Sequence, residues 1–151
     1  MNVFIACSST KNNKRCKAKN MYTGDLFKKS WEYAESLHPD KIYILSGKYH
    51  LLDPDQIIEP YNLYIGDLSQ EDRKKWADEV YKEMKSHHIN FEAKTYFLAG
   101  EDYIEYLRDY FPNRKEMYGD GIGNIMHKLD RLNNKNENLV SLSNYIKESL
   151  Y

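Results

Sequence analysis

The segment CSSTK, at residues 7–11, carries side chains that can bind an anion. It offers a thiol, three hydroxyls and an ammonium, and its loop backbone adds N–H donors. This set suits a phosphate, so Cys7, Ser8 and Lys11 are candidate contacts. Covalent catalysis by Cys7 is not expected, because nothing in the sequence pairs it with a base, and an isolated cysteine more often ends a strand as a small buried residue. The Cys and His spacing fits no zinc site, so neither a metal nor a cofactor is expected.

A second polar segment follows an apolar run, in ILSGKYHLLDPDQIIEP at residues 44–60. Gly47 permits a turn with positive φ, and Lys48 and Tyr49 are then expected to project over the edge of a sheet. The residues that follow form a long connection for a simple turn, and we expect an ordered loop there. Glu59 follows two isoleucines and precedes a proline, a setting expected to shield its carboxylate partly from water. An exposed loop glutamate is the commoner case, but Glu59 is the leading acidic candidate.

Two glycine-containing turns complete the set of candidate loops. AGEDY places Gly100 at a strand-to-helix turn and Tyr103 in the first turn of the helix. GDGIGN resembles a phosphate-binding turn, with Gly121, Gly123 and Asn124 as candidate contacts, although glycine at a helix start also serves close packing. The basic stretch at residues 11–19 can grip a nucleic-acid backbone, and a solvated loop is the simpler explanation of a charge run alone.

Alternating strands and helices are expected to position these loops. Strands are expected at residues 2–7, 41–46 and 94–99, with a short extended piece at 115–117. Amphipathic helices are expected at residues 24–38 and 69–88, from Gly100 onward, and across 122–129. The start of the second helix carries a capping-box-like pair, Ser69 and Asp72.

This order of elements predicts an α/β fold. Residues 1–132 are expected to form a single three-layer domain with a mainly parallel central sheet of about four strands and helices on both faces. Residues 133–151 are expected to form a linker and a C-terminal helix. Ligands of such folds bind outside the carboxyl ends of the strands, which is where all four candidate loops fall.

The composition is that of a folded globular domain, with 41% hydrophobic and 30% charged residues. The net charge is −1, but residues 1–24 contain five Lys or Arg and no Asp or Glu. The 14 tyrosines supply flat surface with a polar tip. Two cysteines are too few for a disulfide framework, and the apolar run at residues 3–7 is too short for a signal peptide or a membrane span. A cytoplasmic protein without membrane contact is therefore expected.

The motifs together resemble those of an uncharacterised bacterial and phage domain family. The resemblance covers about residues 3–132 and rests on six segments in order: CSSTK, MYTGDLFKKSWEYAE, IYILSGKYHLLDPDQIIEPYN, WADEV, FLAGEDYIEYL and GDGIGNIMHKL. That family is distantly similar to the peroxide-stress protein YaaA and to the middle domain of archaeosine synthases. The resemblance implies an α/β domain that acts on nucleic acid or its bases, distantly akin to uracil-DNA-glycosylase folds. This chain departs from the usual Ala-Lys-Tyr-Gly of the members in having Gly47-Lys48-Tyr49-His50.

The first functional expectation is hydrolysis of the N-glycosidic bond to a nucleobase in DNA, modified or not. A base taken out of the stack needs a pocket that can hold it, and its departure leaves an oxocarbenium-like sugar that a carboxylate stabilises. The catalytic candidates are Glu59, Lys48 and Ser8. Stacking and contacts to phosphate or base are assigned to Tyr49, Tyr61, Tyr103, Lys11 and Ser46.

Two alternatives use the same loops. In the first alternative, the chain binds DNA, a nucleotide or a nucleotide-derived signal without turning it over. In the second, it is a hydrolase or base transferase that acts on free nucleosides or nucleotides. The expected partner is nucleic acid, DNA in preference to RNA, or a nucleotide, and the oligomeric state is left open.

Overall fold

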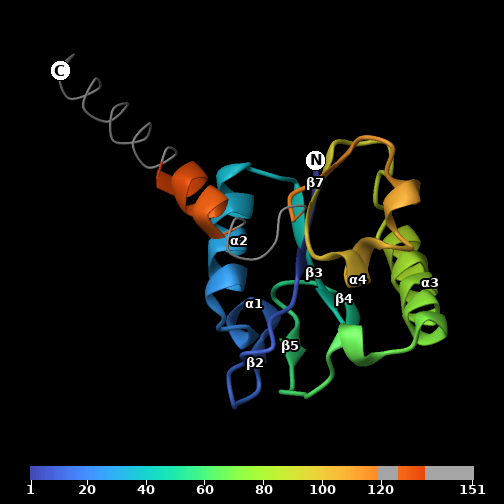
Figure 1. Ribbon diagram of the computed structural model, residues 1–151, viewed down its shortest axis with the longest axis horizontal. Coiled ribbons are helices and arrows are strands. Elements are labelled where there is room, and N and C mark those ends of the chain that lie inside the picture. Colours follow the sequence, from blue (N-terminus) through green and yellow to red (C-terminus); the bar gives the residue numbers. More distant parts are fainter. Residues whose placement is uncertain (119–125, 135–151) are drawn as a thin grey trace.

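The computed structural model describes residues 1–118 and 126–134, which form a five-stranded, mainly parallel sheet with helices packed against it (Figure 1). β1 (Asn2–Ala6) pairs in parallel with β3 (Lys41–Ser46) and β6 (Thr95–Leu98), and β6 pairs in parallel with β7 (Arg114–Glu116). Within the described part of this sheet, only β4 (His50–Leu52) is antiparallel to its neighbour, β3. The α/β class is confirmed, but the sheet has five strands where about four were expected. In spatial order the strands are β4, β3, β1, β6 and β7.

Central strand β1 sends alternate side chains into two hydrophobic clusters. Val3 and Ile5 pack in a cluster with Phe27 and Ala34 of α2 (Asp25–Ser36). Phe4 packs in the other cluster, which includes Trp76, Val80 and Met84 of α3 (Gln70–Ser86). The alternation follows from the two-residue period of a strand. Each such fully buried large side chain contributes roughly 1.5–3 kcal/mol, so the sheet is held from both sides of β1.

The two long helices confirm their expected start signals. The side chain of Ser69 accepts a hydrogen bond from the backbone N–H of Asp72 at 3.1 Å, which caps α3. α2 begins after Gly24 and ends before Pro39. α3 ends at Ser86, two residues before the expected end near His88, because the φ of 57° at His88 ends the helical path.

Two segments expected to be loops contain regular structure. Residues 46–50 turn the chain back into β4, so part of the long connection is a β-hairpin. β2 (Cys16–Lys17) pairs with β5 (Ile57–Ile58) in a separate two-stranded sheet. α1 (Ala18–Met21) follows β2 at the end of the basic stretch and buries two of its residues. The positive φ expected at Gly47 is wrong: in this turn it occurs at His50, with a φ of 63°.

The chain after β6 is less helical than expected. α4 (Glu101–Ile104) is a single turn, and the next turn is the 3-10 helix η2 (Arg108–Tyr110). Tyr103 and Leu107 are buried, whereas Tyr110 is exposed and stacks on Tyr81 of α3 with ring centroids 3.8 Å apart. A second 3-10 turn, η1 (Ile65–Asp67), precedes α3.

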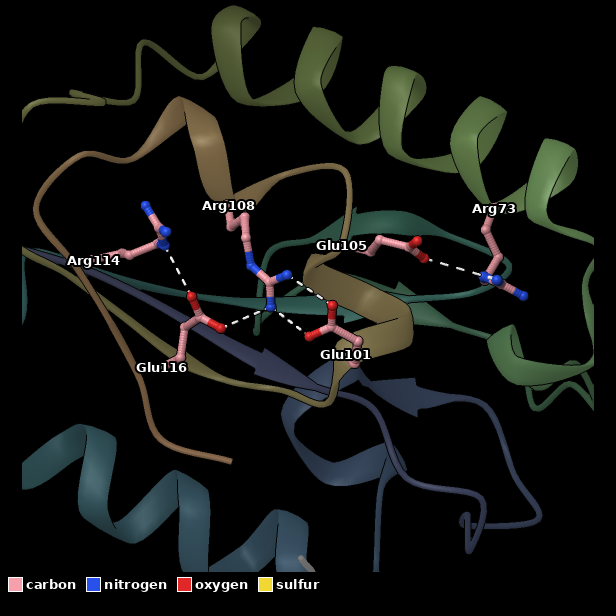
Figure 2. A network of polar contacts seen from close by, with 6 residues as sticks. All are labelled: Arg73, Glu101, Glu105, Arg108, Arg114 and Glu116. Atoms are coloured by element: carbon pink, nitrogen blue, oxygen red, sulfur yellow. Dashed lines mark hydrogen bonds and ion pairs between the residues drawn. The ribbon is translucent and has the colours of Figure 1, made fainter. Parts of the chain in front are cut away.

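A charged network fastens α4 and η2 to β7 (Figure 2). Arg108 donates to Glu101 at 2.7 Å and to Glu116 at 2.8 Å, and Arg114 donates to Glu116 at 2.9 Å. Hydrogen bonds from Arg108 hold the pKa of Glu101 below its usual value. Burial alone would raise the pKa of Glu116, but hydrogen bonds from Arg114 and Arg108 lower it overall. The network therefore fixes the short helix that carries Tyr103.

The last described element is helical at residues 126–134 and buries Leu129. Gly121, Gly123 and Asn124 lie outside the described residues, as does nearly all of the expected linker and C-terminal helix. Within residues 1–118 and 126–134, no helix is both long and apolar enough to cross a lipid bilayer.

Candidate functional site

A pocket of about 400 Å³ opens where the carboxyl ends of the parallel strands meet. β1 delivers one wall directly, because Cys7 follows the last residue of the strand and its backbone N–H donates to Leu45 of β3 at 3.0 Å. α4 supplies Tyr103 from the loop after β6, as the topology predicts. The described residues that line the pocket are Cys7, Ser8, Ser9, Lys11, Asn62, Leu63, Tyr64 and Tyr103.

The predicted loops CSSTK and AGEDY, after β1 and β6, therefore do meet at this pocket. The thiol of Cys7 lies 3.3 Å from the hydroxyl of Tyr103, within hydrogen-bond distance for sulfur. Burial raises the pKa of Tyr103, and the neighbouring Cys7 raises it further. At neutral pH Tyr103 is thus an uncharged phenol, able to donate or accept a hydrogen bond at the pocket wall.

Lys11 is placed over a buried tyrosine network. Its ammonium lies 4.6 Å from the centre of the Tyr61 ring. The Tyr61 hydroxyl is hydrogen-bonded to Tyr22 at 2.7 Å and to Ser46 at 2.8 Å. Ser46 also accepts the backbone N–H of Tyr49 at 3.0 Å, so its role is to hold the turn after β3. Burial is the main reason that the pKa values of Tyr22 and Tyr61 are raised, and these hydroxyls stay protonated at neutral pH.

Two glycines leave room for the pocket residues beside them. A Cβ on Gly24 would lie 2.4 Å from the hydroxyl oxygen of Ser8, whose side chain also bonds the backbone of Thr10. A Cβ on Gly47 would lie 2.6 Å from a terminal methyl of Leu63. Gly47 thus contributes to the site by making room for Leu63, rather than by a left-handed backbone conformation.

Lys48 and Glu59 are not among the described residues that line the pocket. Lys48 is exposed, with its ammonium 5.4 Å from the ring centre of Tyr49. The expectation that Glu59 is partly shielded from water is wrong: 63% of its side-chain surface is exposed, and its carboxylate lies 3.8 Å from Arg15. The isoleucines before it do not cover it, because Ile58 is buried while Ile57 points to solvent, 48% exposed.

Tyr49, Tyr61 and Gly100 lie around the pocket without lining it. The ring of Tyr49 packs edge-on against Tyr61 with centroids 5.5 Å apart, and its hydroxyl donates to the backbone oxygen of Glu59 at 3.3 Å. A Cβ on Gly100 would meet no atom within 4 Å, so close packing does not require glycine there.

The residues missed from the sequence are those of the segment Asn62–Tyr64, whereas Ser9 belongs to the predicted CSSTK loop. Tyr64 is 54% exposed and Leu63 is 36% exposed, and a Cβ on Gly66 would lie 2.4 Å from the Tyr64 ring. Leu63 and Tyr64 are large side chains between Pro60 and the cap of α3 and outside every predicted helix and strand, and this is the signal that would have indicated the segment. They form the outer rim of the pocket.

A second hollow, of about 390 Å³, lies beside the amino end of β3. Its lysines are already paired with carboxylates, Lys41 with Asp53 at 2.5 Å and Lys19 with Asp55 at 3.2 Å. Among the described residues of the whole chain, no group of three or more His, Cys, Asp or Glu side chains is arranged to hold a metal ion. The pocket at the carboxyl edge is therefore the candidate functional site.

Comparison with known proteins leaves the activity of this site open. No curated protein matches the chain by sequence. A family model does match, over residues 3–131, which covers the sheet, the pocket and the helices around them. The chain therefore belongs to a family of unknown function, DUF6884.

Proposed function

We propose that the pocket binds a nucleobase, carried by a nucleotide or by a nucleic-acid strand. The observation that carries this proposal is that one pocket of about 400 Å³ is lined by Lys11, Asn62, Tyr64 and Tyr103 together. That volume is within the usual range of small-molecule pockets, roughly 300–1,000 Å³.

Each class of side chain in the pocket matches one part of a nucleotide. The amide of Asn62 both donates and accepts hydrogen bonds, as base edges do. The exposed ring of Tyr64 offers a face on which a base stacks, which contributes about 1–3 kcal/mol. The ammonium of Lys11 and the hydroxyls of Ser8 and Ser9 suit a phosphate.

Equilibrium binding tests this proposal. Asn62→Ala and Tyr64→Ala are each expected to weaken binding of the preferred nucleoside, nucleotide or labelled DNA strand by about tenfold or more. Asn20→Ala, an exposed asparagine on α1, is the matched control and is expected to leave binding unchanged. Failure of all four deoxynucleosides, their monophosphates and mixed-sequence DNA to bind would contradict the proposal.

The second candidate function is cleavage of the N-glycosidic bond of a bound nucleotide. One observation favours it: an amine, that of Lys11, lies in the pocket lining. In such a step the uncharged amine nitrogen bonds to C1′ of the sugar as the bond from C1′ to the base breaks. The base leaves with the bonding electrons and takes up the proton that the amine nitrogen then releases. Glu59 was expected to stabilise the sugar cation, but its carboxylate is exposed and does not line the pocket, so it does not support this step.

The assay is the release of base from DNA that carries varied modified bases, with borohydride trapping of a covalent adduct that is lost in Lys11→Ala. Release of base from free nucleosides alone would instead support a nucleoside hydrolase.

The finer features of the fold expected from the sequence are also proposals. We infer a three-layer arrangement, supported by the two clusters that Val3 and Phe4 enter from opposite sides of β1. The distant similarity to YaaA and to archaeosine synthases, and a cytoplasmic location, rest on the sequence motifs and composition described above.

A further inference from the structure

Two lysines near the pocket rest on adjacent tyrosine rings rather than on carboxylates. Lys11 lies over Tyr61 and Lys48 lies over Tyr49, at 4.6 and 5.4 Å from the ring centres. The two rings pack edge to face, 5.5 Å apart and at 78° to each other. The order Lys11, Tyr61, Tyr49, Lys48 is therefore continuous, and we call these four residues the Lys–Tyr ladder. It begins at the pocket, which Lys11 lines, and leads away from it.

Other basic side chains near these two lysines are paired with carboxylates. Arg15 lies 3.8 Å from Glu59, and Lys17 and Lys19 lie 3.7 and 3.2 Å from Asp55. In the part of the chain that the structure describes, neither Lys11 nor Lys48 has a carboxylate within ion-pair distance. A tyrosine face attracts an ammonium weakly, by about 0.5–1 kcal/mol at an exposed site, and leaves its charge uncancelled. The two ladder lysines thus remain available to a phosphate.

Hydrogen bonds hold the two tyrosine rings of the ladder in place. The Tyr61 hydroxyl is fixed by Tyr22 and Ser46, and the Tyr49 hydroxyl is fixed by the backbone of Glu59, to which it donates at 3.3 Å and from which it accepts at 3.2 Å. Both rings are therefore fixed, and each lysine ammonium lies over a fixed ring. A cation held in this way loses less conformational freedom when it binds an anion than a lysine on a free stem does.

From this arrangement we infer that the ligand of the pocket is part of a nucleic-acid strand, whose backbone runs along the Lys–Tyr ladder and places one phosphate at Lys11 and another at Lys48. The inference rests on the proposed function and narrows it, because a free nucleoside monophosphate has only one phosphate group and none to reach Lys48. Glu59, whose backbone bonds the Tyr49 hydroxyl, carries an exposed carboxylate beside the ladder, and this charge disfavours a further phosphate there.

Salt dependence of binding tests the inference. The probe is a labelled, random-sequence DNA strand of about ten nucleotides, compared with the four free deoxynucleoside monophosphates. For a single strand, removal of one lysine–phosphate interaction lowers the slope of log K against log salt by about 0.7. Lys48→Ala is therefore expected to reduce the slope for the strand by about 0.7 and to leave mononucleotide binding unchanged. Lys11→Ala is expected to weaken both ligands.

Lys74→Ala, which removes an exposed lysine of α3, is the matched control and is expected to change neither slope nor affinity. Tyr49→Leu, which removes the ring under Lys48 while Lys48 stays, is expected to weaken binding of the strand alone. Equal affinity for the strand and a mononucleotide, or an unchanged slope in Lys48→Ala, would overturn the ladder while leaving the nucleobase pocket intact. Absence of binding to every probe would instead overturn the proposed function itself.

Discussion

The hydroxyl of Tyr61 lies 2.7 Å from the hydroxyl of Tyr22, at a point where three segments distant in the sequence meet. Tyr22 directly follows α1, Tyr61 follows β5, and their common neighbour Ser46 ends β3. The network joins the small two-stranded sheet to the main sheet, directly beneath Lys11. It therefore links the stability of the fold to the geometry of the pocket.

Removal of the Tyr61 hydroxyl is expected to destabilise the protein. Tyr61→Phe deprives the hydroxyls of both Tyr22 and Ser46 of this partner in a mostly buried setting, which costs about 1–3 kcal/mol of unfolding free energy. Tyr22→Phe is expected to cost less, because Tyr61 keeps Ser46. The double variant is expected to cost less than the two single costs together, since the same hydrogen bond is removed in both. Urea unfolding measures all three.

Tyr33→Phe provides the control for this series. Tyr33 is also buried, and within the described residues its hydroxyl has no hydrogen bond. Its loss is expected to change the unfolding free energy by less than about 0.5 kcal/mol. If Tyr61→Phe were no more destabilising than Tyr33→Phe, the network would contribute nothing to stability.

Alanine at Gly47 is expected to weaken ligand binding more than it weakens the fold. The new Cβ would lie 2.6 Å from a methyl of Leu63, so this exposed side chain must move and the rim of the pocket changes. Because the displaced atom is the end of a flexible side chain, the unfolding free energy is expected to fall by less than about 1 kcal/mol. Gly100→Ala is the control, since open space surrounds that position. Equal binding by both variants, measured by anisotropy with labelled DNA, would show that Leu63 has no part in the site.

Glutamine at Glu59 is expected to leave binding of a labelled DNA strand within about twofold of the parent protein. The carboxylate is exposed and 3.8 Å from Arg15, and an exposed pair of this kind contributes little. Asp55→Asn, which removes another exposed carboxylate, is the matched comparison. A tenfold loss of binding or of base release confined to Glu59→Gln would contradict this prediction and return Glu59 to the catalytic role first expected for it.

The network around Arg108 is expected to make stability sensitive to acid. The pKa values of Glu101 and Glu116 in the folded protein lie below the usual 4.5. The unfolded chain therefore takes up protons first as the pH falls, so the stabilisation is complete above pH 4.5 and is lost as the pH falls through the folded values. Urea unfolding at a series of pH values measures the decline.

Arg108→Gln is expected to flatten this decline, because without the guanidinium the pKa of Glu101 is no longer lowered and the pKa of Glu116 is lowered by Arg114 alone. At neutral pH the same change is expected to lower the unfolding free energy by about 1–2 kcal/mol, since it leaves two neighbouring carboxylates without their shared partner. Lys75→Gln breaks an exposed pair with Glu71 on α3 and serves as the comparison. A decline in Arg108→Gln as steep as in the parent protein would show that other groups cause the acid sensitivity.

The sequence predicted the long elements well, because their signals are local. The apolar run of β3 matches its observed bounds, and Trp76, Val80 and Met84 repeat at helical spacing along α3 and are buried. β2, β4 and β5 were missed because strands of two or three residues are too short to show a period of two. Those strands form through pairing with partners elsewhere in the chain, which no local pattern shows.

The candidate site was predicted in part. Parallel topology brings Cys7, Ser8, Lys11 and Tyr103 together, as expected for residues at the carboxyl ends of β1 and β6. The turn after β3 was assigned to the pocket, but the β3–β4 hairpin carries Lys48 past it, and the connection after β5 brings Asn62–Tyr64 to the rim instead. Which part of a long connection returns to the sheet depends on such pairings.

The outer strands of the sheet, β4 and β7, have three residues each, and all three residues of β7 (Arg114, Lys115 and Glu116) are charged and exposed. An approaching chain that tried to extend the sheet would find only a short row of free N–H and C=O groups at either border. On the β7 side it would also have to strip water from charged side chains. The longer, more apolar strands lie between these borders, so crowded solutions should favour separate molecules over fibrous aggregates.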